Sequence, residues 1–412
     1  MKDETINDYI SIIVINKSMN LFAMNLIVLL AILITVNSSI CPNKTRIVKD
    51  RDFQSIQLKY PYTNVFFQKD SNYYYVAGNH NGHLEQTLIE KFERKGDIWT
   101  RFYPDGFIFN EVFTTKDYVF AIGCTKVIQG AFLIIVNATS SAVLRHYFVE
   151  KYCYTSVVAN NNYYFIAGTK YIGNETYAFV SKHEIKNEKL IYEQIYGDNN
   201  YNDTASNKCE NKGVNLVLIS DDEIIVTMVL RKYNNDDNYI CWTYILNVKG
   251  DGKTTQWEVK LYPFSNSAPT AISTYNDIVS VAGRFMFNLQ LENTRQRVVA
   301  CGLGLDSFLV TINITNGAIL YFGSFCDISE ISSLHINNCR FVISGKHKKI
   351  QNKVYIATQN HNSVNRERHT YHVNETLVDS TVNSQMHVED DYITTIVKND
   401  LVHLERYIMM NN

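Results

Sequence analysis

The chain has 412 residues, of which 46% are hydrophobic, and a formal net charge of −2. This balance provides no basic surface for a nucleic acid or for an anionic membrane, so both kinds of partner are excluded as principal ligands. The 28 tyrosines and 21 phenylalanines favour β-strands.

Near the N-terminus, Leu21–Val36 forms an apolar segment that is followed by the small residues Ser38 and Ser39. A membrane-spanning helix needs about 20 apolar residues, whereas the core of a signal peptide needs roughly 7–15. We therefore predict that residues 1–38 are a cleaved signal peptide or, if uncleaved, an N-terminal membrane anchor. A buried helix is the remaining interpretation.

A short pattern recurs along the rest of the chain: an aspartate or asparagine, then an apolar run that usually ends in glycine. A continuous apolar run of this length is typical of a strand that is buried on both faces. The copies end at residues 78, 123, 168, 228, 283, 345 and 397, so one repeat spans 45 to 62 residues. The seven copies are Asn72–Gly78, Asp117–Gly123, Asn162–Gly168, Asp222–Met228, Asp277–Gly283, Cys339–Gly345 and Asp391–Val397.

Each copy can be the second of four antiparallel strands, which we name A to D from the axis outwards. The seventh repeat ends after its third strand, Leu401–Arg406, while an additional strand, Thr45–Arg51, precedes the first repeat. Pairing these two segments would close a ring and protect an open strand edge. The sequence therefore predicts an all-β fold, in which residues 42–412 form a single seven-bladed β-propeller of four-stranded blades. We expect a monomer.

The third repeat carries a resemblance to a known family. Gly168–Tyr196 has a Gly-Thr after strand B, an Ala-Phe-Val third strand and an aromatic fourth strand. In these features it resembles the bacterial SBBP-type propeller repeat, a relative of the kelch and PQQ-like classes. The family has an aspartate where this chain has Tyr177. The resemblance implies a propeller and no particular activity.

All eight cysteines follow the apolar segment, and an even number in an exported chain predicts disulfides. Antiparallel strands place the B–C loops and the D–A connections on the same face, which brings three pairs close together. We predict the bonds Cys124–Cys153, Cys209–Cys241 and Cys301–Cys326 and, by elimination, Cys41–Cys339.

Six Asn-x-Ser/Thr triplets are candidate glycosylation sites, because such acceptors occur near strand ends and loops of exported proteins. They begin at Asn43, Asn137, Asn174, Asn202, Asn313 and Asn374.

The sequence predicts no catalytic residue, metal ligand or cofactor site. The stretch Asp198–Asp203 is only superficially like a calcium loop, since Cys209 stands where the last carboxylate should be. His347, His361, His369 and His372 lack metal-binding spacing. The residues of the A strands that could face a central channel include only one carboxylate: Asn64, Asn110, Glu111, Thr155, Ser156, Asn215, Ser273 and Ser332.

Three functions fit these features. The first is a secreted or surface-tethered interaction module that binds a protein or a glycan through the faces of the propeller. The second is a structural component of an extracellular coat or wall. The third is an enzyme with its active site in the channel, which would require at least two carboxylates or histidines converging there.

Overall fold

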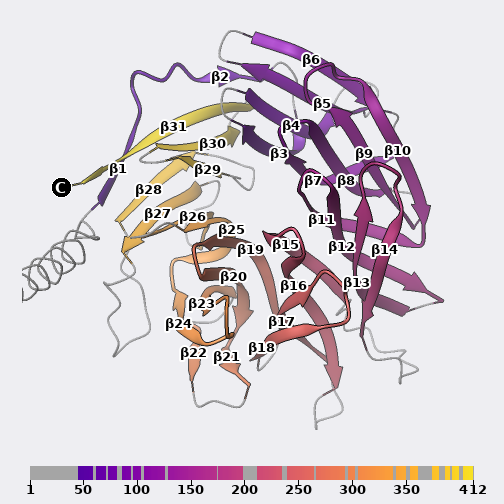
Figure 1. Ribbon diagram of the computed structural model, residues 1–412. Helices are drawn as coiled ribbons and strands as arrows, with labels where there is room; N and C mark the ends of the chain where they lie inside the picture. Colours follow the sequence, from indigo (N-terminus) through magenta and orange to yellow (C-terminus); the bar gives the residue numbers. More distant parts are fainter. Residues whose placement is uncertain are drawn as a thin grey trace, which may run out of the picture. The chain divides into compact units, whose positions relative to one another are not determined.

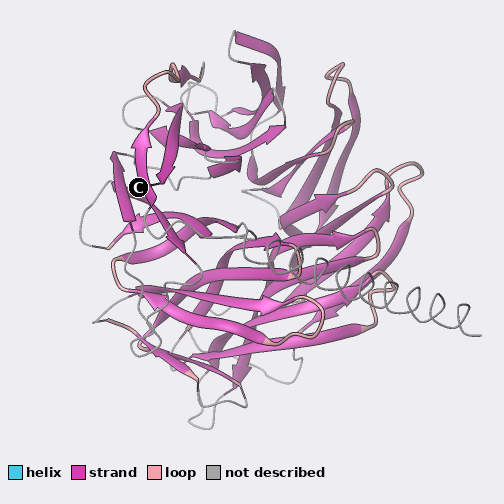
Figure 2. Cartoon of the chain, turned by 60° about the vertical axis from the view of Figure 1, so that its left-hand side comes forward, coloured by secondary structure: helices cyan, strands magenta, loops and turns pink. Residues whose placement is uncertain are grey.

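The chain divides into two compact units, residues 1–42 and 43–412. The computed structural model describes residues 45–411, apart from several short gaps and the longer ones at 81–85, 198–210, 234–238, 361–373 and 380–385. Every regular element in this part of the chain is a β-strand (Figure 2). No helix among the described residues is long and apolar enough to cross a membrane. The apolar segment Leu21–Val36 lies outside them.

Six sheets each have four main strands that occur in chain order, and the sheets follow one another around a central axis (Figure 1). In each of these sheets the first strand lies nearest the axis and the later strands follow outwards, each antiparallel to its neighbour. Blade 1 contains β3 (Tyr62–Asp70), β4 (Tyr73–His80), β5 (Gln86–Glu93) and β6 (Gly96–Tyr103). Blade 2 contains β7 (Phe107–Thr114), β8 (Tyr118–Thr125), β9 (Gly130–Asn137) and β10 (Val143–Glu150). Blade 3 contains β11 (Tyr152–Ala159), β12 (Tyr163–Ile172), β13 (Glu175–Glu184) and β14 (Leu190–Tyr196).

The next three blades follow the same plan. Blade 4 contains β15 (Lys212–Ser220), β16 (Glu223–Tyr233), β17 (Tyr239–Lys249) and β18 (Thr255–Pro263). Blade 5 contains β19 (Ser267–Tyr275), β20 (Ile278–Met286), β23 (Leu305–Asn313) and β24 (Ile319–Phe325). Blade 6 contains β25 (Ile328–Ile336), β26 (Arg340–His347), β27 (Lys353–Asn360) and β28 (Asn374–Asp379).

The remaining sheet is assembled from both ends of the described chain. It contains β29 (Met386–Glu389), β30 (Tyr392–Lys398), β31 (Val402–Asn411) and β1 (Thr45–Lys49), and the short β2 (Ile56–Gln57) also pairs with β31. The predicted pairing of the N-terminal strand with the last strand is confirmed, since Thr45 lies opposite Asn411 and Lys49 opposite Tyr407.

The prediction of seven like blades is wrong. The structure has six blades whose four main strands occur in chain order, and the segment Asp391–Val397 instead contributes β30 to this closing sheet. The closing sheet has five strands because β31 is long enough to pair with both β1 and β2 along one edge. Four strands per blade is also not general, because blade 4 gains two more.

These additional strands in blade 4 come from blade 5. After β20, the hairpin β21 (Asn288–Leu291) and β22 (Arg297–Val299) leaves its own sheet and pairs with the outer strand β18, where Leu261 lies opposite Leu291. The long spacing between the fifth and sixth repeats contains this hairpin. It covers an edge whose backbone groups would otherwise be unpaired.

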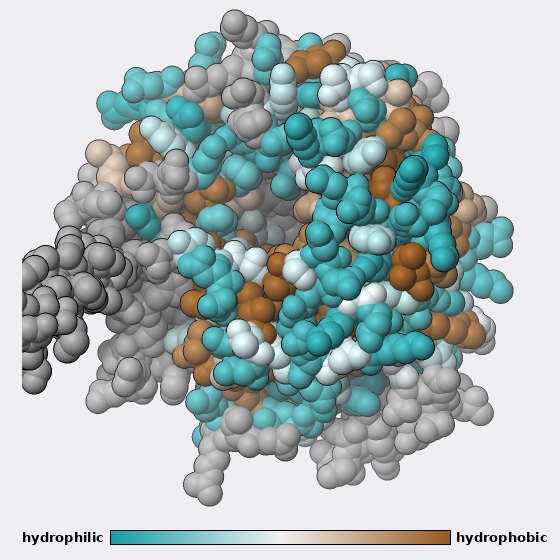
Figure 3. Space-filling model, in the orientation of Figure 1, coloured by the Kyte–Doolittle hydropathy of each residue, from teal (hydrophilic) through white to brown (hydrophobic). Residues whose placement is uncertain are grey.

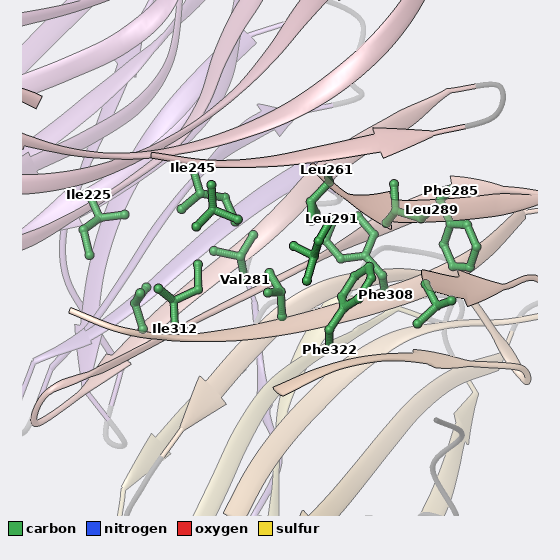
Figure 4. Close-up of a cluster of buried hydrophobic side chains, with 14 of the residues drawn as sticks. Ile225, Ile245, Leu261, Val281, Phe285, Leu289, Leu291, Phe308, Ile312 and Phe322 are labelled. Atoms are coloured by element: carbon green, nitrogen blue, oxygen red, sulfur yellow. The ribbon is translucent and has the colours of Figure 1, made fainter. Parts of the chain in front are cut away.

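Neighbouring blades pack face to face through apolar side chains. Figure 4 shows the cluster between blades 4 and 5, where Ile225 and Ile245 meet Val281, Phe308 and others. The closing sheet packs on both of its neighbours: Leu404 joins the cluster of blade 1, and Tyr407 joins residues of blade 6. The ring is therefore continuous around its axis.

Candidate functional site: the central channel

The first strands of the blades surround a cavity of about 730 Å³ at the axis. Its wall includes residues of β3, β7, β11, β15, β19, β25 and β29. A hollow with mainly hydrophilic side chains at its border opens near the middle of the face shown in Figure 3. This is the concave, partly polar kind of site at which propellers and other folds hold ligands.

The structure places most of the predicted channel residues in this wall. Five of the eight line the cavity: Asn110, Glu111, Thr155, Asn215 and Ser332. Ser156 and Ser273 instead have their hydroxyls bonded to backbone N–H groups of the following blade. Asn64 lies in β3, but its side chain is outside the described part.

A β-bulge shapes the inner strand of every blade. The register shifts by one residue in β3, β7, β11, β15, β19 and β25. The extra residues are Thr63, Asn110, Thr155, Val214, Thr270 and Ser332. A bulge bends its strand and redirects a side chain, and in blades 2, 3 and 5 it directs a polar group towards the next blade.

The bulge residues connect neighbouring blades by hydrogen bonds. Asn110 donates from Nδ2 to the carbonyl oxygen of Tyr154 at 2.6 Å, and Thr155 donates from Oγ1 to that of Gly213 at 2.5 Å. Thr270 donates in the same way to Ile331. In each bond the acceptor directly precedes the bulge of the next blade. Val214 has no polar atom with which to donate. The bonds of Asn110, Thr155 and Thr270 show that most polar side chains of the wall are structural, and their donor groups are already engaged.

The residue after the bulge makes a second kind of connection. Glu111 accepts a hydrogen bond from the N–H of Val157 at 2.6 Å, and Ser156 accepts one from the N–H of Leu216 at 3.0 Å. Glu111 is the only charged residue in this role among the described contacts. Burial raises the pKa of its carboxyl group to about 7, although the bonds to Val157 and Ser156 partly oppose the shift.

We expect Glu111 to make the stability of the protein depend on pH. Its pKa is about 7 in the folded chain against an ordinary value of 4.5, so the folded state holds a proton that the unfolded state releases first. The contribution of Glu111 to the free energy of unfolding should be highest below about pH 4.5 and fall by up to about 3 kcal/mol as the pH rises to 7. Urea unfolding at a series of pH values measures this slope.

Glu111→Gln keeps an acceptor for the N–H of Val157 but does not titrate, so its slope over this range should be flatter. Glu150→Gln, at an exposed glutamate of β10, is the control and should retain the slope. An unchanged slope in Glu111→Gln would contradict the assignment.

Charged residues that the sequence analysis missed lie at one end of the channel: Lys212, Arg284, Glu330 and Lys346 all line the cavity. Arg284 and Lys346 directly follow the motif glycines Gly283 and Gly345. The sequence therefore contained a signal for these two residues, because the residue after each of these glycines pairs with a residue near the start of the inner strand. Glu330 lies 3.7 Å from Arg284 and 3.9 Å from Lys346.

The cysteines of the described residues agree with the loop positions used in the sequence analysis. A disulfide joins Cys124 to Cys153 with Cα atoms 4.9 Å apart, and another joins Cys301 to Cys326 with Cα atoms 5.3 Å apart. Cys241 also forms a disulfide. Its predicted partner Cys209, like the predicted pair Cys41 and Cys339, lies outside the described residues.

Two candidate glycosylation sites occupy equivalent turns. Asn137 and Asn313 each end a third strand, and each side-chain oxygen accepts hydrogen bonds from the N–H groups two and three residues later. The third residues of the two triplets, Thr139 and Thr315, are exposed. Asn374 begins β28, whereas Asn43, Asn174 and Asn202 lie outside the described residues.

The structure brings together no metal site within the part it describes, where no group of three or more histidines, cysteines or carboxylates converges. His347 lies in β26. The remaining histidines of its predicted cluster and the acidic stretch Asp198–Asp203 are outside the described residues.

A match to a solved WD40 domain supports the propeller fold. The WD40 domain of Pan2 from Neurospora crassa matches with a TM-score of 0.52 at 10% identity, over 89% of this chain and 94% of that one. The propeller domain of the Trilobed protease from Pyrococcus furiosus matches at 0.48 and 9% identity, over 86% and 99%. The polysaccharide lyase Uly1 also matches at 0.48 and 9% identity, over 87% and 91%.

No protein-family model matches the chain, and no curated protein matches it either. The arrangement of the sheets and the WD40 match show that the chain is a β-propeller module built from repeats. The resemblance of Gly168–Tyr196 to the SBBP-type repeat has no support from a family model.

Proposed function

We propose that the protein is an exported propeller that binds a protein or a glycan at the mouth of its central channel. The observation that supports this proposal is the cavity of about 730 Å³. One end of the cavity is lined by the charged residues Lys212, Arg284, Glu330 and Lys346. Inside the cavity the polar groups largely hold the blades together, whereas Arg284 and Lys346 are about half exposed. Loops and rims that project from a rigid scaffold are where binding usually occurs.

The test blocks the mouth. Ala268 lines the cavity next to Arg284, so Ala268→Trp should fill the entrance. Gln256→Trp adds the same side chain at an exposed position of β18 and serves as control. On a panel of purified extracellular glycans and proteins, the mouth variant should lose the binding shown by the wild type and the control. Equal binding by all three proteins would overturn the proposal.

The proposal includes export. Residues 1–38 act as a signal peptide or membrane anchor, and the chain from residue 42 onwards is one glycosylated monomeric domain. The two disulfides support an oxidising compartment, because such bonds persist outside the reducing cytosol. From the resemblance of Gly168–Tyr196 alone, the proposal also assigns the blades to the SBBP-type class.

Glycosylation of Asn137 can be separated from its role in the turn. Thr139→Ala removes the acceptor triplet but leaves the Asn137 side chain bonded in the turn. We expect this variant, expressed in a secreting eukaryotic host, to lose one glycan on a gel while its free energy of unfolding changes by less than about 0.5 kcal/mol.

Asn137→Ala should lose the same glycan and also about 1 kcal/mol of stability, because the turn loses its side-chain acceptor. Identical gel mobility of the wild type and Thr139→Ala would show that Asn137 carries no sugar.

An enzyme is the second candidate, because two carboxylates, Glu111 and Glu330, line the same cavity. Burial raises the pKa of Glu111 to about 7, as a general acid requires. A panel of chromogenic glycosides tests this reading: hydrolysis by the wild type that disappears in Glu111→Gln would favour it, and no hydrolysis of any member would exclude glycosidase activity on that panel.

A further inference from the structure

Three cationic side chains occupy the same level of the channel on three consecutive blades. The bulges of blades 4, 5 and 6 lie at Val214, Thr270 and Ser332, and the residues two positions earlier are Lys212, Ala268 and Glu330. Arg284 lies opposite Ala268 and Lys346 lies opposite Glu330 in the adjacent strands. Lys212, Arg284 and Lys346 therefore line the cavity at one height.

A single carboxylate is shared between two of these cations. Glu330 lies 3.7 Å from the guanidinium of Arg284 and 3.9 Å from the ammonium of Lys346. Both distances are longer than a charge-assisted hydrogen bond of about 2.8 Å. The two cations are 45% and 53% exposed, whereas Glu330 is 24% exposed. Arg284, Lys346 and Glu330 together leave an excess of one positive charge.

This excess contrasts with the whole chain, whose net charge is −2. A cavity with low-dielectric walls concentrates the field of the charges at its mouth and attracts an anion. The guanidinium of Arg284 can bind a planar or tetrahedral oxyanion through two parallel hydrogen bonds. Lys346 can supply further donors from the neighbouring blade.

We propose that Arg284 and Lys346 bind the carboxylate or sulfate group of an acidic sugar at the channel mouth, while Glu330 orients both side chains. The proposal rests on the proposed function and narrows its ligand. A glycan is favoured over a protein because the centre of a protein interface is depleted of charged residues and is mostly apolar. Here the charges lie inside the entrance, and Asn215 adds a polar group to the wall.

Titration calorimetry of the full chain provides the test, with four probes: a sulfated oligosaccharide, an oligouronate, a neutral oligosaccharide of equal length and an oligoglutamate peptide. The first two should bind, and the neutral sugar should not. Because charged hydrogen bonds are lost, Arg284→Ala and Lys346→Ala should each weaken binding about tenfold. Glu330→Gln should strengthen binding about threefold, since it removes the competing carboxylate.

Arg297→Ala and Lys189→Ala remove exposed cations on β22 and in the β13–β14 turn and should leave binding unchanged. Weaker binding by Glu330→Gln, or equal binding of the neutral sugar, would overturn the proposal. Tighter binding of the peptide than of either sugar would assign the site to an acidic protein instead. If Ala268→Trp abolishes partner binding but Arg284→Ala does not, the channel mouth is the binding site and the anion site is wrong.

Discussion

Replacing Gly168 by alanine is expected to destabilise the protein by about 3 kcal/mol, a large effect for the addition of one methyl group. Gly168 ends the apolar run of β12 in the middle of blade 3, between Tyr154 of β11 and Phe179 of β13. A Cβ atom at this position would overlap the carbonyl oxygen of Cys153 and lie 3.0 Å from the ring of Phe179. The backbone oxygen cannot move without breaking the sheet, so the strand itself would have to shift.

The same arrangement recurs at other motif glycines. At Gly123 and Gly283 an added Cβ would overlap the carbonyl oxygen of the inner strand and the phenylalanine ring of the third strand, Phe132 or Phe308. At Gly345 it would overlap the carbonyl oxygen of Glu330. The recurring glycine thus provides space for the bulged inner strand to approach closely.

Gly173→Ala is the matched control in the same blade. Gly173 has a φ of +62° but no atom within 4 Å of an added Cβ, so alanine there should cost only about 1 kcal/mol through backbone strain. Urea unfolding of the wild type and both variants measures the difference. Equal stability of the Gly168 and Gly173 variants would contradict the steric explanation of the motif.

Removing the disulfide between Cys124 and Cys153 by a double alanine substitution should lower the free energy of unfolding by about 3.5 kcal/mol in the chain-entropy model. The bond closes a segment with a sequence separation of 29 and joins the end of β8 in blade 2 to the start of β11 in blade 3. Without the bond, the unfolded chain would regain most of the conformational entropy that this cross-link removes, and this gain favours unfolding.

The second disulfide provides the comparison. Cys301 and Cys326 have a sequence separation of 25, so their double alanine variant should lose nearly the same stability, because the entropy depends only weakly on loop length. Reduction of the wild type with dithiothreitol should destabilise it more than either double variant, because it opens both of these bonds and that of Cys241. A loss below about 1 kcal/mol in both double variants would show that the bonds add little to stability.

The sequence by itself determined the features that depend on local pattern. The apolar runs ending at Gly123, Gly168, Gly283 and Gly345 indicated buried second strands, because strand periodicity and burial are encoded within a few residues. Since neighbouring strands of a blade are consecutive in the chain, the loops that carry Cys124, Cys153, Cys301 and Cys326 could be placed on one face, and the structure joins those cysteines in the expected pairs.

The tertiary structure alone decided the features that depend on register between distant strands. The bulges that point Asn110 and Thr155 at the next blade, the pairing of β18 with β21, and the building of the closing sheet in place of a seventh like blade all join residues far apart in the chain. The charged channel mouth is of the same kind, since Lys212, Arg284 and Lys346 belong to three different blades and line one cavity only when these blades pack together. Such pairings are selected by packing across the whole ring, and a sequence pattern of single strands does not encode them.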